Sequence, residues 1–193
     1  MNFALSEEQR MLSDLVARFV EDELMPLEST VLARESDGDG GSLTDEELGP
    51  LHARCKELGL WGLDVPEELG GANLDSVSLV AVNEALRRTV VPFTFPPDSP
   101  NLHMLMTTVT DEQREQYLDP YARGEAVSAI AIFEPGAGGD PAGMITRAVR
   151  DGDDWVINGR KIWVSRIRDA DFSIVMAVTD PKKGSRGGIT AFL

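Results

Sequence analysis

The sequence contains few cysteines, histidines and basic residues. Cys55 is the single cysteine among 193 residues, so the chain cannot form an internal disulfide or a cysteine cluster for zinc or iron–sulfur. His52 and His103 lie far apart in the sequence without a ligand partner at metal-binding spacing, and we predict structural roles for both and no metal site. With 18 Lys and Arg against 33 Asp and Glu, the net charge of -15 repels phosphate backbones. We therefore expect no nucleic acid partner.

Long hydrophobic runs are also missing. No window approaches the roughly 18 consecutive apolar residues that cross a bilayer. The residues before Glu7 and Glu8 lack the basic segment and the cleavage site of a secretion signal. We expect a soluble cytoplasmic protein without a membrane partner, in a reducing compartment that suits one free cysteine. Because no turn or polar tail follows the last apolar stretch, Ile189 to Leu193, we also expect a fragment of a longer protein.

What is present is a globular composition, 42% hydrophobic, in two parts of different periodicity. Before about Gly124 apolar residues recur with a helical period, and after it they alternate as in strands and hairpins. The sequence therefore predicts an α+β fold. An N-terminal all-α domain over residues 1–124 is followed by an incomplete, mostly antiparallel β-domain over residues 125–193.

Capping residues mark the starts of two helices. Ser6 with Gln9, and Thr44 with Glu47, have the spacing of a capping box, and Gly59 is placed to end the second helix. The third helix, residues 76–88, has apolar residues around most of its circumference, which predicts a central, buried helix. Two short helices follow, over residues 101–106 and 110–123.

The C-terminal part contains strand and turn signals. Residues 126–133 suit a buried strand, while Asp151-Gly152 and Asn158-Gly159 are residue pairs typical of tight hairpin turns. Residues 145–165 are therefore predicted to form a three-stranded meander. Two further strands are predicted at Phe172 to Val178 and Ile189 to Leu193.

Two segments are candidates for a ligand site. If Asn158-Gly159 starts a strand, then Lys161, Trp163 and Ser165 share one face, and an indole beside a hydroxyl suits a planar heteroaromatic cofactor. A core tryptophan and an edge serine are the commoner interpretation of that spacing. The glycine-rich loop 134–140 lets its backbone approach a ligand closely, but it lacks the pattern of a dinucleotide or Walker loop and also suits a plain connection between strands.

In order and together, these segments resemble the acyl-CoA dehydrogenase family over nearly the whole chain. The match runs through Ser6 to Gln9, Leu58 to Gly62, Val65 to Gly71, Glu112 to Glu125, Glu134 to Asp140, and Asn158 to Ser165. The resemblance implies an FAD enzyme of fatty acid and lipid metabolism that oxidises the α,β-carbon bond of an acyl-CoA. It also implies electron-transfer flavoprotein as the acceptor and a homo- or hetero-oligomer.

The resemblance implies roles for six residues as well. Trp163 would pack against the isoalloxazine and Ser165 would hydrogen-bond near its reactive edge. Ile132, Phe133, Gly138 and Gly139 would line the flavin or the thioester arm.

Two positions depart from the family's pattern. Phe133 stands where the family usually has threonine, and Gly139 where it usually has serine, so two hydroxyl groups are lost. Each lost hydrogen bond is worth about 0.5–1.5 kcal/mol.

The resemblance implies a catalytic base from a region after the β-domain, so we assign no catalytic residue in this sequence. We predict that Glu134 positions the turn in which it lies. We also expect the chain alone to be inactive. The alternatives are a non-catalytic, acyl-CoA dehydrogenase-like subunit of a hetero-oligomer and an acidic interaction module.

Overall fold

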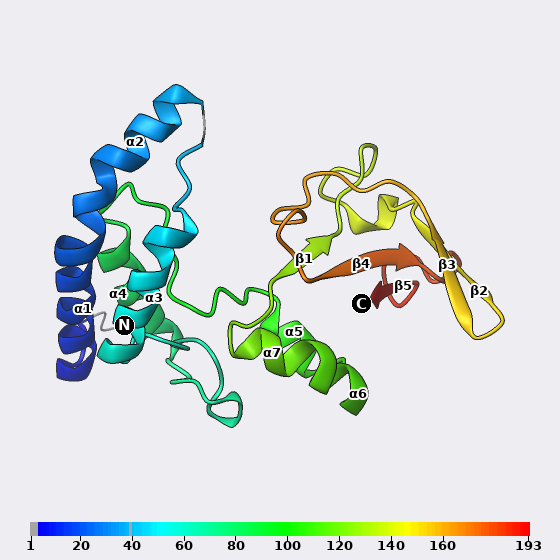
Figure 1. The fold of residues 1–193 in the computed structure, drawn as a ribbon. Helices are drawn as coiled ribbons and strands as arrows, with labels where there is room; N and C mark the ends of the chain where they lie inside the picture. The colour runs from blue at the N-terminus through cyan, green and yellow to red at the C-terminus, as the bar shows by residue number, and fades with distance from the viewer. Residues whose placement is uncertain (1–3, 39) are drawn as a thin grey trace. The chain divides into compact units, whose positions relative to one another are not determined.

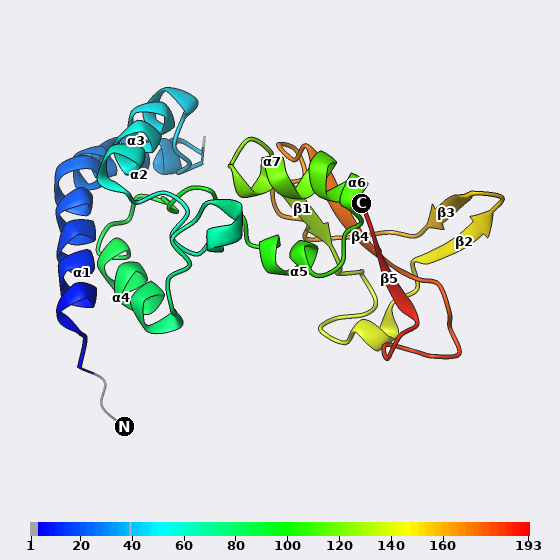
Figure 2. The ribbon, with the colours of Figure 1, turned by 90° about the horizontal axis from the view of Figure 1, so that it is seen from below.

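A computed structural model describes residues 4–38 and 40–193, and its contacts divide the chain into two compact units, Met1–Asp98 and Ser99–Leu193 (Figures 1 and 2). No helix among the described residues is both long enough and apolar enough to span a membrane.

The first unit is helical. Its elements are α1 (Glu7–Phe19), a π-helical turn η1 (Val20–Leu24), a 3-10 turn η2 (Met25–Leu27), α2 (Glu28–Asp37), α3 (Asp45–Leu58), η3 (Glu67–Leu69) and α4 (Ser76–Leu86). The helical path continues through Pro26, which stands at the start of the short 3-10 turn η2 between η1 and α2.

Both predicted capping boxes are confirmed. The Ser6 hydroxyl accepts from the Gln9 N–H at 3.1 Å, and the Gln9 side chain accepts from the Ser6 N–H at 3.0 Å. Thr44 and Glu47 make the same reciprocal pair at the start of α3, which ends at Gly59 with φ 70. These polar contacts satisfy N–H groups that have no partner inside the helix.

Replacing Thr44 with alanine removes one half of its capping box, and we expect the free energy of unfolding to fall by about 1 kcal/mol. Urea denaturation of the full-length protein measures this. Ser36→Ala is the matched control, because the Ser36 hydroxyl only donates back to the Leu32 carbonyl inside α2. We expect that change to stay within about 0.5 kcal/mol. Equal losses in the two variants would contradict the capping role.

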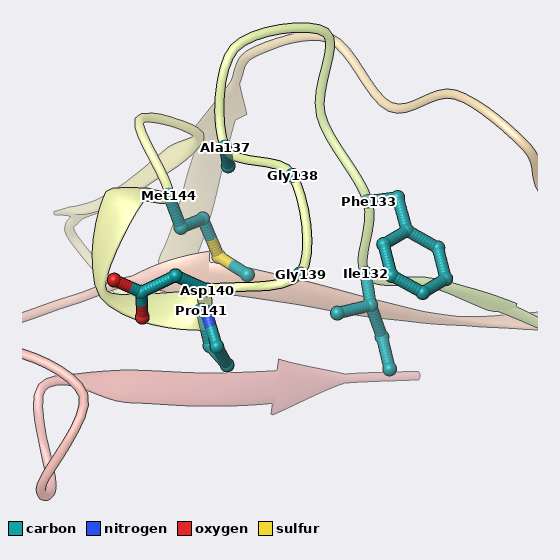
Figure 3. Close-up of a pocket in the computed structure, with 8 residues that line it drawn as sticks. All are labelled: Ile132, Phe133, Ala137, Gly138, Gly139, Asp140, Pro141 and Met144. Carbon is teal, nitrogen blue, oxygen red and sulfur yellow. The ribbon is translucent and has the colours of Figure 1, made fainter.

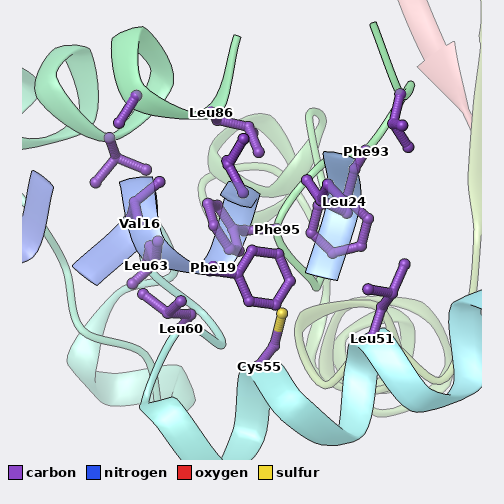
Figure 4. Packing of buried hydrophobic residues seen from close by; sticks show 14 of the residues in the cluster. Val16, Phe19, Leu24, Leu51, Cys55, Leu60, Leu63, Leu86, Phe93 and Phe95 are labelled. Atoms are coloured by element: carbon purple, nitrogen blue, oxygen red, sulfur yellow. The ribbon is translucent and has the colours of Figure 1, made fainter. Parts of the chain in front are cut away.

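The core of the first unit lies where α1, η1, α3 and α4 meet the segment that follows α4 (Figure 4). Phe19, Phe93 and Phe95 form its aromatic centre, with ring centroids 5.5 to 5.6 Å apart. Cys55 is fully buried beside them, and burial raises the pKa of its thiol to about 12. A thiol that stays protonated is a poor nucleophile, so Cys55 is core.

The prediction that the third helix is central and buried is wrong. In α4, Ala81, Ala85 and Leu86 are buried, but Val77 and Val80 are 55% and 65% exposed. The helix packs one face against α1 and presents valines on the other. Composition alone misled here, because short apolar side chains also occupy exposed helix positions.

The second unit combines short helices with a sheet. Its elements are α5 (Leu102–Met106), α6 (Asp111–Gln113), a π-helical turn η4 (Arg114–Leu118), α7 (Asp119–Ala122), β1 (Ser128–Ala131), η5 (Pro141–Gly143), β2 (Arg147–Asp151), β3 (Asp154–Asn158), β4 (Phe172–Val178) and β5 (Ile189–Phe192). The helices pack on the sheet, where the buried Tyr121 ring meets Phe172 edge-on at 5.6 Å. The boundary between residues 124 and 125 stays a prediction, while the contacts place these helices in one unit with the strands.

The sheet is mixed, and the α+β class is confirmed. β1 runs parallel to β4, β5 runs antiparallel to β4, and β2 and β3 form an antiparallel hairpin. Arg147 of β2 pairs with Val178 at the end of β4 and so attaches the hairpin to the sheet. A tight hairpin turn is confirmed here, one residue later than predicted: Asp151 still pairs with Asp154, so the two turn residues are Gly152, with φ 62, and Asp153.

The third strand of the predicted meander is wrong. Residues 159–171 form loop and turns, and Asn158-Gly159 is no hairpin turn. Close packing requires a glycine at position 159, because a Cβ built there would lie 2.2 Å from the Thr146 Oγ1. Trp163 has φ 56, in the left-handed region, which a regular strand excludes.

Candidate functional site

Four of the six predicted site residues line one hollow at the end of β1. Ile132, Phe133, Gly138 and Gly139 surround it with Ala137, Asp140, Pro141 and Met144 (Figure 3). Ile132 and Phe133 lie on one side, and the glycine loop runs between them and Met144. The hollow measures about 20 Å³, room for about one water, so it is a notch in an open surface and no enclosed ligand cavity.

The glycine-rich loop next to this notch offers space and donors. A Cβ built at Gly136, Gly138 or Gly139 would meet nothing within 4 Å, and Gly138 has φ 53. Within the described part of the chain, the N–H groups of Gly138 and Gly139 donate to no other residue. The loop is held by its neighbours, where the Asp140 N–H donates to the Ala137 carbonyl at 3.2 Å. This turn therefore carries two backbone donors without a partner among the described residues.

Trp163 and Ser165 occupy a loop after β3, so the argument that strand alternation places them on one face is wrong. The Ile162 N–H donates to the Phe133 carbonyl at 3.0 Å, which brings this loop beside the end of β1. Trp163 follows directly and its side chain is 82% exposed. Ser165 is exposed at the start of a turn.

The carboxylate of Glu134 joins three segments beneath the notch. Its Oε2 accepts from the Ile145 N–H at 2.7 Å, and its Oε1 accepts from the Thr146 N–H at 2.9 Å and from the Lys161 Nζ at 2.9 Å. The same Nζ donates to the Ile132 carbonyl at 3.0 Å. The predicted role of Glu134 in its turn agrees with these contacts, whereas sequence reasoning gave Lys161 no role.

Glu134 is 3% exposed and is held as an anion. Burial raises the pKa of its carboxyl, and the hydrogen bonds from Thr146, Ile145 and Lys161 lower that pKa by more, to about 2. A carboxylate with so low a pKa and with both oxygens occupied is a poor proton acceptor at neutral pH. Glu134 therefore serves structure and not proton transfer.

The exposed surface around the notch fits a planar, partly polar ring system. Trp163 is 82% exposed, and Phe133, whose carbonyl accepts from the N–H of Ile162, is 48% exposed. Ring stacking on the indole and hydrogen bonds from the free loop N–H groups are the contacts that a flavin needs. Phe133 and Gly139 contribute no hydroxyl, and at Gly139 the backbone N–H is the donor that is left. No cluster of metal-binding side chains occurs among the described residues.

Comparison with known proteins gives two family matches. The family description "Acyl-CoA dehydrogenase, N-terminal domain" matches residues 6–125, and "Acyl-CoA dehydrogenase, middle domain" matches residues 129–193. The chain is 42% identical to (R)-benzylsuccinyl-CoA dehydrogenase of Thauera aromatica. The match covers 100% of this chain and 50% of that protein.

Two solved structures share the fold. A putative acyl-CoA dehydrogenase from Mycobacterium abscessus matches with TM-score 0.83 and 32% identity, over 97% of this chain and 50% of that one. A glutaryl-CoA dehydrogenase from Mycobacterium smegmatis, solved in complex with FADH2, matches with TM-score 0.69 and 28% identity, over 97% and 45%.

The chain spans about half the length of the curated relatives it matches. Both family descriptions together cover nearly all of its residues, in the order that the sequence predicted. The wall formed by the notch, the glycine loop and Trp163 lies within the part matched by the middle domain. The chain belongs to the acyl-CoA dehydrogenase family.

Proposed function

We propose that the full-length protein is an FAD-dependent acyl-CoA dehydrogenase. In this proposal Ile132, Phe133, Gly138, Gly139, Trp163 and Ser165 contact the flavin or the thioester arm of the substrate. The observation that carries the proposal is the exposed Trp163 face beside a fixed loop with two free N–H donors, in a chain of this family. The 82% exposure of Trp163 leaves its ring accessible for stacking against a planar ligand.

Bound FAD supplies a hydride acceptor for the β-carbon of an acyl-CoA when the α-proton is removed. The residues of this chain bind and orient. Trp163 offers the stacking surface, the N–H groups of Gly138 and Gly139 offer hydrogen bonds to carbonyl oxygens, and Ile132 and Phe133 keep the adjoining surface apolar. Glu134 is not the base, because its pKa is about 2 and its oxygens are occupied.

Substrate, partner and location follow from the same proposal. The resemblance to (R)-benzylsuccinyl-CoA dehydrogenase supports an acyl-CoA thioester as substrate and makes an aromatic dicarboxylic acyl group one candidate. The reduced flavin needs an acceptor, and we propose electron-transfer flavoprotein. We also propose a cytoplasmic homo- or hetero-oligomer that acts in fatty acid or related lipid metabolism.

The visible absorbance spectrum of the purified full-length protein tests the proposal. We expect the bands of oxidised flavin, and we expect one member of an acyl-CoA panel that includes (R)-benzylsuccinyl-CoA and butyryl-CoA to bleach them without oxygen. A preparation that has no flavin after reconstitution with FAD, and no bleaching by any thioester, would reject the proposed activity.

A second candidate is a non-catalytic subunit that keeps an acyl-CoA site. It is favoured by Phe133, a half-exposed ring at the notch, and by Gly139, neither of which offers a hydroxyl. Calorimetric titration separates the two functions. Binding of CoA thioesters without FAD would favour the subunit, and binding of neither would favour an acidic interaction module.

A further inference from the structure

The buried ion pair of Glu134 and Lys161 connects the segments that form the candidate wall. Glu134 follows Ile132 and Phe133 at the end of β1 and opens the glycine loop. Its carboxylate holds the N–H groups of Ile145 and Thr146, where that loop returns to the sheet. Lys161 approaches from the third segment, two residues before Trp163.

The contacts of Lys161 connect that third segment to the other two. Its Nζ donates both to Oε1 of Glu134 at 2.9 Å and to the Ile132 carbonyl at 3.0 Å, and its side chain is only 11% exposed. The next residue, Ile162, donates its N–H to the Phe133 carbonyl at 3.0 Å. Two successive residues are thus tied to the end of β1 immediately before the backbone turns into the left-handed conformation of Trp163.

Among the described residues, few other contacts fix the position of the exposed Trp163 indole. Trp163 is 82% exposed, and its φ of 56 costs free energy that the surrounding contacts must offset. A buried ammonium between a carboxylate and a carbonyl forms charge-assisted hydrogen bonds, which are stronger and more directional than neutral ones. They are also protected from screening by salt.

We propose that Lys161, through its ion pair with Glu134, is the positioning residue that sets the place of Trp163 against the end of β1 and the glycine loop. The pair touches no ligand itself. It fixes the distance between the stacking surface and the loop donors, and a binding site must hold such groups to within roughly 0.5 Å. The part of this inference that concerns FAD affinity rests on the proposed function, whereas the placing of Trp163 does not.

The test uses the full-length protein labelled with 5-fluorotryptophan, whose ¹⁹F spectrum gives separate resonances for its tryptophans, Trp61, Trp155 and Trp163 among them. Trp163→Phe assigns the resonance. We expect Lys161→Met to unfold cooperatively, to move or broaden the Trp163 resonance more than those of Trp61 and Trp155, and to weaken FAD binding about tenfold or more. The control is Arg34→Met, which breaks another partly buried ion pair, with Glu47 at 2.9 Å, in the first unit. It should lower stability and leave both readouts unchanged.

An unmoved Trp163 resonance in folded Lys161→Met overturns the inference, whatever happens to FAD. If the wild-type protein binds no FAD, the proposed function fails and the resonance alone decides the positioning role. If Lys161→Met does not fold, Lys161→Gln takes its place, because its neutral amide removes the charge that pairs with Glu134 while a polar group still fills the buried position. The same shift is then expected, and its absence is equally decisive.

Discussion

Replacing Glu134 with alanine should lower the free energy of unfolding by about 3–5 kcal/mol, among the largest effects of any single substitution in this chain. The change leaves the ammonium of Lys161 buried without its counter-charge and removes the acceptor of the Ile145 and Thr146 N–H groups. Each buried group that loses its partner adds a desolvation penalty. Urea denaturation of the full-length protein, followed by far-UV circular dichroism, measures the loss.

Two comparisons isolate the cause. Glu57→Ala removes an exposed carboxylate that pairs with Arg54 at 2.9 Å, and we expect a change within about 0.5 kcal/mol. The double variant Glu134→Ala with Lys161→Met removes both charges and should be more stable than Glu134→Ala alone, because no unpaired charge stays buried. A double variant less stable than the single one would contradict the importance of the ion pair.

The pH dependence of the free energy of unfolding should also show the contribution of the Glu134 carboxylate. The pKa of Glu134 in the folded protein is about 2, below its ordinary value of 4.5. A carboxyl with a depressed pKa binds fewer protons in the folded state, so it stabilises the fold above about pH 4.5 and loses this contribution as the pH falls toward 2. Glu134→Gln should therefore show a shallower loss of stability over that interval than the wild-type protein does.

The features that the sequence predicted well are those decided by neighbouring residues. A capping box is complete within four positions, so Ser6 with Gln9 and Thr44 with Glu47 could be identified without knowledge of the fold. β4 is likewise an apolar run whose bounds, Phe172–Val178, agree with the prediction. Buried strands of this kind are specified by their own composition.

The features that it predicted wrongly depend on distant partners. The alternation around Trp163 is typical of a strand, but the hydrogen bond from Ile162 to Phe133 and the close contact of Gly159 with Thr146 lead the chain into a loop. The partner of Lys161 is 27 positions away, and nothing local marks a lysine as buried. Only the alignment of three segments in space shows that Lys161 supports the wall.

The candidate site falls between these cases. The glycine spacing correctly predicted an open loop at Gly138 and Gly139, because a residue without a Cβ leaves room whatever the tertiary context. The role of Trp163 and Ser165 stays a prediction. Their exposure depends on the path of the loop after β3, which single-sequence periodicity cannot determine.

Gly71→Ala should destabilise the first unit by about 3 kcal/mol, the upper end of the range for overpacked positions. A Cβ at Gly71 would lie 2.0 Å from the Val65 carbonyl oxygen and 2.4 Å from the Val65 Cβ, so the obstacle is backbone that no rotamer change can move away. The loop has little freedom to shift, since the Asn73 N–H donates to that same carbonyl at 2.9 Å and the Ala72 N–H to the Gly62 carbonyl at 2.8 Å. Thermal and urea unfolding of the full-length protein measure the change.

The adjacent Gly70 gives the matched control. Comparing the two variants separates the cost of a steric clash from the cost of a left-handed backbone conformation. Gly70 has φ 86 but nothing within 4 Å of an added Cβ, so Gly70→Ala should cost only the left-handed penalty of about 1–2 kcal/mol. From highest to lowest, the order of stability is then wild type, Gly70→Ala, Gly71→Ala. A Gly71→Ala variant as stable as Gly70→Ala would mean that the loop of residues 62–74 yields, and that its backbone contacts with Val65 contribute little.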